Sequence, residues 1–220
     1  LIPGHSGTVV SFAPIPTENT ARYFDVSPDA SHWCASVFLQ LTTGLVVDGQ
    51  AVLIGGLPVK TGAPVPSSIA SQATWTRISD VAVDDQGSWT AVLSYRFATG
   101  AVSSGVFRDG VPLVQSGDTV DGAGPLSTFY RAITTRNGRL AYLASGPNFA
   151  QHFFVDGRIV VSRGDTIDYT GDGVIDPGYT LFRIGDGAVE LDDDGTIWLL
   201  ARINTPSGAT TDWLLLEIPG

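Results

Sequence analysis

The chain has 220 residues, a formal net charge of −10, 43% hydrophobic residues and 15% charged residues. This length and composition are typical of one globular domain with a substantial core, and they exclude a disordered chain. Nucleic acid and anionic membranes both require a basic face, so the acidic balance disfavours them as partners and suits cations or neutral ligands better.

The residue types favour turns and strands over helices. Nineteen of the 22 acidic residues are Asp, and Lys60 is the only lysine. Asp and the 26 glycines favour turns, whereas Glu and Lys favour helices. No segment has helical periodicity of useful length, and no apolar run is long enough to predict a transmembrane segment. We therefore expect an all-β protein, and its single cysteine, Cys34, excludes an intrachain disulfide.

A motif made of a polar turn followed by a long strand occurs four times along the chain. Its turns place a small residue at positions 31, 87, 138 and 195, which are 56, 51 and 57 residues apart. The repeat is therefore roughly 55 residues long, and such a period indicates a repeat architecture. The four copies are SPDASHWCASVFL (27–39), VDDQGSWTAVLSY (83–95), TTRNGRLAYLASG (134–146) and LDDDGTIWLLARI (191–203).

A second motif follows in the first three copies. It reads x-Asp-Gly, then an apolar stretch, then a glycine seven residues after the first. Asp-Gly between apolar runs is typical of a type I′ hairpin turn, because that turn needs positive φ at both central residues. The pairs are Asp48-Gly49, Asp109-Gly110 and Asp156-Gly157.

Each copy has room for four strands, which in the second copy we expect at 77–84, 88–96, 104–109 and 111–116. Four-stranded antiparallel units repeated radially are β-propeller blades, so we expect residues 1–220 to form a single four-bladed β-propeller. A β-sandwich and an irregular β-solenoid are the alternatives. The repeats run over 22–75, 76–128, 129–179 and 180–220, the last completed by 1–15.

The fourth copy lacks a fourth strand, because its third strand, 212–220, ends where the other copies continue with x-Asp-Gly. Residues 6–15, SGTVVSFAPI, have the composition of a strand. They also lie about as far before the polar turn of the first copy as the fourth strand of one copy lies before the polar turn of the next. We therefore expect the N-terminal strand to close the last blade, which would leave the ring without an exposed edge.

These units resemble the propeller-type repeats of secreted bacterial proteins that are common in planctomycetes. The segments DVAVDDQGSWTAVLSY (80–95) and GVFRDGVPLVQSGDTV (105–120) carry the resemblance best, and it extends over most of residues 20–218. It implies a propeller fold and an extracytoplasmic location, either periplasmic or secreted, and it supplies no catalytic residue. Such chains usually have more than four blades, which leaves room for a fragment of a longer propeller or for a small ring that pairs with another subunit.

The segment DYTGDGVID (168–176) is the candidate metal site, inserted in a connection between two blades. Oxygen ligands at its positions 1, 3, 5 and 9, a glycine at position 6 and a main-chain carbonyl at position 7 suit calcium. Ile175 is expected to anchor the loop in the core. The predicted ligands are Asp168, Thr170, Asp172, Asp176 and the Val174 carbonyl.

This segment resembles the calcium loops of integrin-type propellers and the first part of dockerin loops. Two departures reduce the charge around the ion, since Thr170 replaces the usual Asp or Asn and Tyr179 stands where an EF-hand has Glu. An Asp/Gly turn held by local hydrogen bonds is the alternative. We expect the calcium to be structural.

The remaining polar and aromatic clusters are interpreted as structure. The acidic turns at 84–85 and 192–194 are expected to be solvated, and the tryptophans to pack in the core or between blades rather than stack on sugars. His5, His32 and His152 lack metal-ligand spacing, and neither Gly-x-Ser-x-Gly nor HExxH occurs. The tryptophans are Trp33, Trp75, Trp89, Trp198 and Trp213.

We therefore expect a non-enzymatic, extracytoplasmic propeller that binds or scaffolds a protein partner within a larger surface assembly. The alternatives are a carbohydrate-binding lectin and a hydrolase that uses carboxylates at the central channel. The lining of that channel discriminates between them. Converging acids with arginine favour the enzyme, apolar residues favour the scaffold, and exposed tryptophans favour the lectin.

Overall fold

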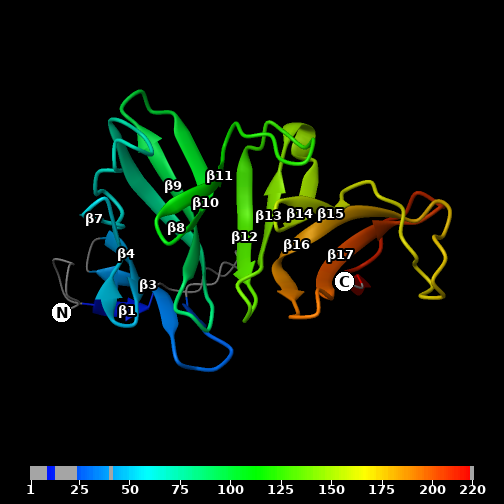
Figure 1. The fold of residues 1–220 in the computed structure, drawn as a ribbon. Coiled ribbons are helices and arrows are strands. Elements are labelled where there is room, and N and C mark those ends of the chain that lie inside the picture. Colours follow the sequence, from blue (N-terminus) through cyan, green and yellow to red (C-terminus); the bar gives the residue numbers. More distant parts are fainter. Residues whose placement is uncertain (1–8, 13–23, 40–41, 219–220) are drawn as a thin grey trace.

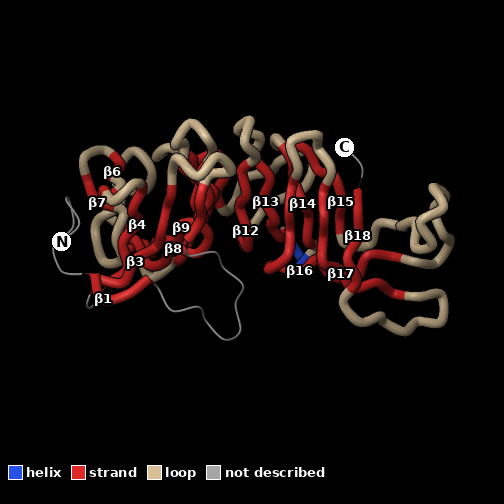
Figure 2. The backbone as a smooth tube through the Cα atoms, turned by 90° about the horizontal axis from the view of Figure 1, so that it is seen from below, coloured by secondary structure: helices blue, strands red, loops and turns tan. Residues whose placement is uncertain are grey.

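A computed structural model shows an all-β protein in which four antiparallel sheets follow one another along the chain (Figure 1). It describes residues 9–12, 24–39 and 42–218. In both Figure 1 and Figure 2 the sheets lie in a row, with the first and the fourth at opposite ends. Across the described part of the chain, no helix is long and apolar enough to cross a membrane.

The first sheet is built around its longest strand, β3. Its strands, with the small β6–β7 sheet that follows, are β1 (Val9–Phe12), β2 (Phe24–Val26), β3 (Trp33–Leu39), β4 (Thr42–Val47), β5 (Gln50–Ala51), β6 (Leu53–Ile54) and β7 (Leu57–Pro58). β4 pairs with one edge of β3, and β1 and β2 share the other edge. Val26 of β2 is opposite Trp33, and Val9 of β1 is opposite Leu39.

The expected closure of the last blade by the N-terminal strand is wrong for the residues that the structure describes. β1 pairs with β3 in the first sheet, and within the described part no strand of the first sheet pairs with one of the fourth. β2 pairs with only the first part of β3, so the rest of that edge of β3 is open to β1, which is near in sequence. Pairing of β1 with β3 closes a much shorter loop than pairing of β1 with the fourth sheet would. Residues 1–8 and 13–15 lie outside the described residues.

The second and third sheets are four-stranded meanders in chain order. The strands expected in the second copy are confirmed, although β8 begins earlier than expected. The strands of these sheets are β8 (Ala73–Val83), β9 (Trp89–Phe97), β10 (Val102–Arg108), β11 (Val111–Gln115), β12 (Thr128–Thr134), β13 (Leu140–Ser145), β14 (Gln151–Val155) and β15 (Arg158–Ser162). A short 3₁₀-helix, η1 (Pro147–Phe149), connects β13 to β14.

The fourth sheet has three strands in the described part, β16 (Thr180–Leu191), β17 (Ile197–Asn204) and β18 (Leu214–Ile218). β17 lies in the middle, so β18 is an edge strand. This sheet is therefore one strand shorter than the second and the third.

The predicted type I′ turns are confirmed by their backbone angles. Asp109 and Gly110 have φ of 48° and 84°, and the other two Asp-Gly pairs are similar. The carboxylate of Asp109 accepts the main-chain N–H of Trp89 at 3.0 Å, and its own N–H donates to the Trp89 carbonyl at 3.1 Å. Asp48 and Asp156 make the same two bonds to the residues that open β3 and β13. Each aspartate therefore fixes the hairpin turn to the start of the strand before the one that leads into the turn.

The turns between first and second strands are joined from sheet to sheet. The main-chain N–H of Asp29 donates to Asp85 at 2.9 Å, and Asp85 forms an ion pair with Arg136 at 3.0 Å. Asp84 is fully buried and forms an ion pair with Arg108 at 2.6 Å, so the expectation that it is solvated is wrong. Burial of this carboxylate is possible because the guanidinium compensates its charge. Residues 192–194 are exposed, as expected.

Each main hydrophobic core joins two neighbouring sheets. Leu45 of the first sheet and Trp75 of the second belong to one buried cluster, and Val106 of the second and Phe154 of the third belong to another. A third cluster joins the third and fourth sheets in the same way. The sheets are therefore held in their row mainly by apolar burial between them.

Truncation of Trp89 tests whether the second strands are anchored by their opening residue. Trp89 is 8% exposed, whereas the equivalent Trp33 is only half-buried. Trp89→Ala should therefore cost about 3–5 kcal/mol of unfolding free energy, and Trp33→Ala clearly less. Urea denaturation of both variants measures the difference, and equal losses would contradict this packing.

Candidate functional site

The first strands of all four repeats contribute to one polar pocket of about 320 Å³. These strands, β2, β8, β12 and β16, line it near their ends, together with the turns that follow them. We call it the central pocket. Its charged lining residues are Asp25, Arg136, Glu190, Asp192 and Asp193.

Several of these charges already have structural contacts. Asp25 accepts the main-chain N–H of Val83 at 2.9 Å and so ties the first sheet to the second. Asp192 accepts the indole N–H of Trp198 at 3.1 Å, and Arg136 is the partner of Asp85. Four acids against one arginine leave the pocket negative, which suits a cation or a neutral polar ligand.

The aspartate-rich segment lies in the connection between β15 and β16, as expected, and projects from the row (Figure 1). Gly164 donates its N–H to the Leu181 carbonyl at 2.8 Å, just as Gly117 does to Leu126 in the second copy. Sixteen residues (165–180) lie between Gly164 and Leu181, against eight (118–125) in the second copy, which is an insertion of eight residues.

The three carboxylates of this loop accept main-chain hydrogen bonds. Asp168 accepts from Gly171 at 2.7 Å and Gly173 at 2.6 Å, and Asp176 accepts from Tyr169 and Thr170 at 2.8 and 2.9 Å. Burial acts against the charge of Asp168, but the N–H groups of Gly173, Gly171 and Asp172 outweigh it and hold the pKa of this carboxyl below its usual range. These contacts match the hydrogen-bonded turn that was the alternative to a metal site.

The donor set of the loop still fits calcium in chemistry. All the side-chain donors are oxygens, and Asp172 uses only one carboxylate oxygen in the described contacts, toward the Val174 N–H at 2.9 Å. In the residues that the structure describes, however, no three His, Cys, Asp or Glu side chains gather as a metal cluster. Ile175 is 53% exposed, so its expected role as a core anchor is wrong.

Each of the two described histidines shares one side-chain hydrogen bond, and the cysteine is buried. His32 shares a hydrogen bond of 2.8 Å with Asp48, and His152 shares one of 2.8 Å with Ser162. Cys34 lies buried in β3, and burial raises the pKa of its thiol, so it stays protonated and unreactive at neutral pH. His5 lies outside the described residues.

The tryptophans divide between core and surface. Trp75 and Trp89 are buried, as expected, and Trp75 packs edge-on against Tyr95 and Phe107. Trp213 is 43% exposed, so the expectation that it packs in the core is wrong. It directly precedes the edge strand β18, where there is less structure to cover it.

Sequence reasoning did not single out the residues of the central pocket. Asp25 and Glu190 lie near the ends of first strands, and only the packing of four sheets brings them together. No protein-family model matches the sequence, and no curated protein matches it either. Arguments about function therefore rest on the chain itself.

The two described histidines should titrate in opposite directions. The hydrogen bond to Asp48 raises the pKa of His32 above 6.5, whereas burial lowers the pKa of His152 below it. The stabilisation from His32 is fully present below pH 6.5 and is lost as the pH rises through the raised pKa. Titration by NMR should separate the two signals. Asp48→Asn, which keeps a turn-forming side chain, should return His32 to its ordinary pKa, and an unchanged value would contradict the pairing.

Proposed function

We propose that the chain is a non-enzymatic, extracytoplasmic module of the β-propeller type that binds or scaffolds a protein partner in a larger assembly. The convergence of four first strands on one pocket supports the propeller arrangement, because the first strands of blades surround a common axis. The extracytoplasmic location rests on the resemblance of the repeats to those of secreted proteins.

The scaffold proposal is supported mainly by the exposed edge of strand β18. This strand pairs on one side only in the described part of the chain, and its Leu215 is 63% exposed. An exposed apolar edge strand is a template for a strand from another chain. A partner strand would give the fourth sheet the strand that the second and third already have.

A hydrolase is the second candidate, because acids and an arginine meet in the central pocket. Paired carboxylates can serve as acid and base in glycoside hydrolysis. Against this candidate, Asp25, Asp192 and Arg136 already serve structural contacts. The binding module is therefore the better supported function.

We also propose that the loop 168–176 binds one structural calcium ion through Asp168, Thr170, Asp172, Asp176 and the Val174 carbonyl. The ion would neutralise three carboxylates that lie within nine residues of one another. Its contribution would be to the stability of the projecting loop rather than to a reaction.

The scaffold proposal predicts a discrete complex when the protein is purified from its native source under mild conditions. Leu215→Asp should weaken that complex, because a charge on the β18 edge opposes strand addition. Val111→Asp, at a similarly exposed apolar residue of β11, is the control and should leave it intact. Turnover of nitrophenyl glycosides or phosphates that disappears in Glu190→Gln would support the hydrolase instead.

The calcium proposal predicts a melting temperature that depends on free calcium. Binding should add about 2.7 kcal/mol of unfolding free energy when free calcium is 100 times its dissociation constant. Asp172→Ala should abolish this gain, whereas Asp193→Ala, at an exposed aspartate outside the loop, should retain it. Identical melting curves with calcium and with chelator would leave only the polar turn.

A further inference from the structure

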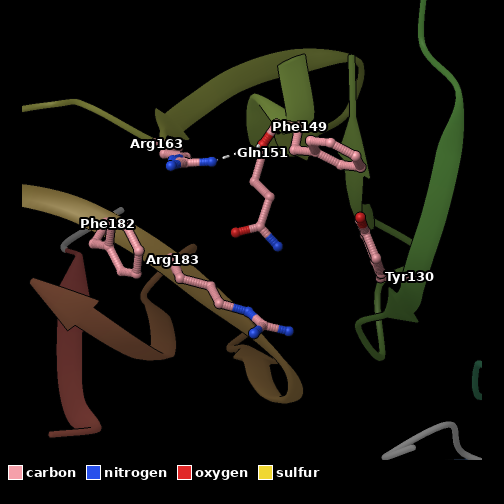
Figure 3. A pocket seen from close by; sticks show the side chains of 6 residues that line it. All are labelled: Tyr130, Phe149, Gln151, Arg163, Phe182 and Arg183. Carbon is pink, nitrogen blue, oxygen red and sulfur yellow. Dashed lines mark hydrogen bonds between the residues drawn. The ribbon is translucent and has the colours of Figure 1, made fainter. Parts of the chain in front are cut away.

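A second pocket, of about 300 Å³, lies between the third and fourth sheets (Figure 3). We call it the arginine pocket, because its described lining residues include two guanidinium groups and no carboxylate. The third sheet and its connections supply four of its residues and β16 supplies two. They are Tyr130, Phe149, Gln151, Arg163, Phe182 and Arg183.

Neither arginine has an acidic partner among the side chains that the structure describes, a set that leaves out residues 186–189. Arg163 lies 5.2 Å from the centre of the Phe182 ring and reaches the Phe149 carbonyl at 3.4 Å, a long hydrogen bond. Arg183 lies 5.9 Å from the centre of the Trp213 ring. Both side chains are exposed, so each can turn toward a ligand.

Among the described side chains Arg77, Arg96, Arg158 and Arg202 also lack an acidic partner, but Arg163 and Arg183 are the two arginines that line one pocket together. The chain has 22 acidic and 12 basic residues, and three other arginines of the described part each contact an aspartate at 2.6–3.0 Å. A guanidinium has five N–H donors in a fixed plane that matches a carboxylate. Two such groups that line one pocket without an acid indicate an anionic ligand.

The floor of the pocket is rigid and already satisfied. Gln151 is 7% exposed, and its amide accepts from the Ile184 N–H at 2.9 Å and donates to the Ile184 carbonyl at 3.2 Å. These two bonds fix β14 against β16 and so set the distance between the walls. A site with fixed walls loses little entropy when a ligand binds.

The mouth of the pocket carries an exposed aromatic ring. Phe149 is 77% exposed, and it and Asn148 have φ of 58° and 57°, a left-handed conformation that is costly for residues other than glycine. Costly backbone of this kind clusters at ligand sites. In Figure 3 the Phe149 ring lies beside the cavity, on the same side as Tyr130. Aromatic faces of this kind can stack on a sugar ring.

We propose that the arginine pocket binds an acidic sugar residue, with its carboxylate between Arg163 and Arg183 and its ring against Phe149. The inference goes beyond the proposed scaffold function, because it adds a ligand class at a site separate from the β18 edge. The volume suits one or two sugar rings rather than a long chain segment. Because the whole protein carries a charge of −10, a sugar with one charge suits it better than a heavily charged polyanion.

The test is a titration of the purified protein by NMR with methyl glucuronide, the neutral methyl glucoside and inorganic sulfate. Glucuronide should shift the signals of residues around the pocket, and the glucoside should bind at least about tenfold more weakly, since it lacks the charge-assisted bonds. Arg183→Gln should weaken glucuronide binding by a similar factor, and Phe149→Ala should also weaken it. Arg158→Gln, which removes an exposed charge of β15 outside the pocket, is the control and should leave it within twofold.

Three results would overturn the proposal: equal binding of glucuronide and glucoside, sulfate binding as tight as glucuronide binding, or an equal loss in Arg158→Gln. Thermal melting of each variant checks its fold, and no replaced side chain belongs to a core cluster. Formation of the complex at the β18 edge tests the scaffold proposal independently of sugar binding. If that complex forms while glucuronide fails to bind, the sugar site alone is wrong. If glucuronide binds while Leu215→Asp changes nothing, the scaffold proposal alone is wrong.

Discussion

Three aspartates fix the geometry on which the other contacts of this molecule depend. Each is the first central residue of a type I′ turn, and its carboxylate and its own N–H both bind the residue that opens the second strand. The turn, the second strand and the third strand therefore share one register. A slip of one residue would place apolar side chains on the solvent face and break both bonds at once. Because the register is fixed, the same apolar side chains of each sheet always face the neighbouring sheet.

Neighbouring sheets add polar contacts to their shared cores. Asp25 accepts the N–H of Val83, Asp80 accepts the N–H of Ala132 at 2.8 Å, and Gln151 bonds to Ile184. Each of these side chains bonds to the main chain of the next sheet, in contacts from the first sheet to the second, the second to the third and the third to the fourth. Asp80 and Gln151 are buried, and buried polar groups are costly unless they are satisfied, so these two favour one relative placement of the sheets over others. That placement creates the central pocket and the arginine pocket.

Local features of this fold could be predicted from the sequence, whereas long-range ones could not. The strands, the Asp-Gly turns and the inserted loop follow from patterns within about ten residues. The position of β1 could not be predicted, because a short apolar strand matches any open edge with the right alternation. The burial of Asp84 depends on Arg108, which lies 24 residues away. Arg163 and Arg183 line one pocket because the main-chain bond from Gly164 to Leu181 brings the two ends of the connection between β15 and β16 together. Neither arginine belongs to a sequence motif.

The closed bases of the connections between sheets have a consequence for how such a chain can vary. Gly62 donates to Trp75, Gly117 to Leu126 and Gly164 to Leu181, each at 2.8 Å. The connections enclosed are 63–74, 118–125 and 165–180, which are 12, 8 and 16 residues long. Because main-chain bonds hold the two ends of each connection together, the length of the loop between them does not affect the geometry of the sheets. Evolution can lengthen, shorten or exchange these loops without moving the strands, and a foreign peptide grafted at the same points should leave the scaffold intact.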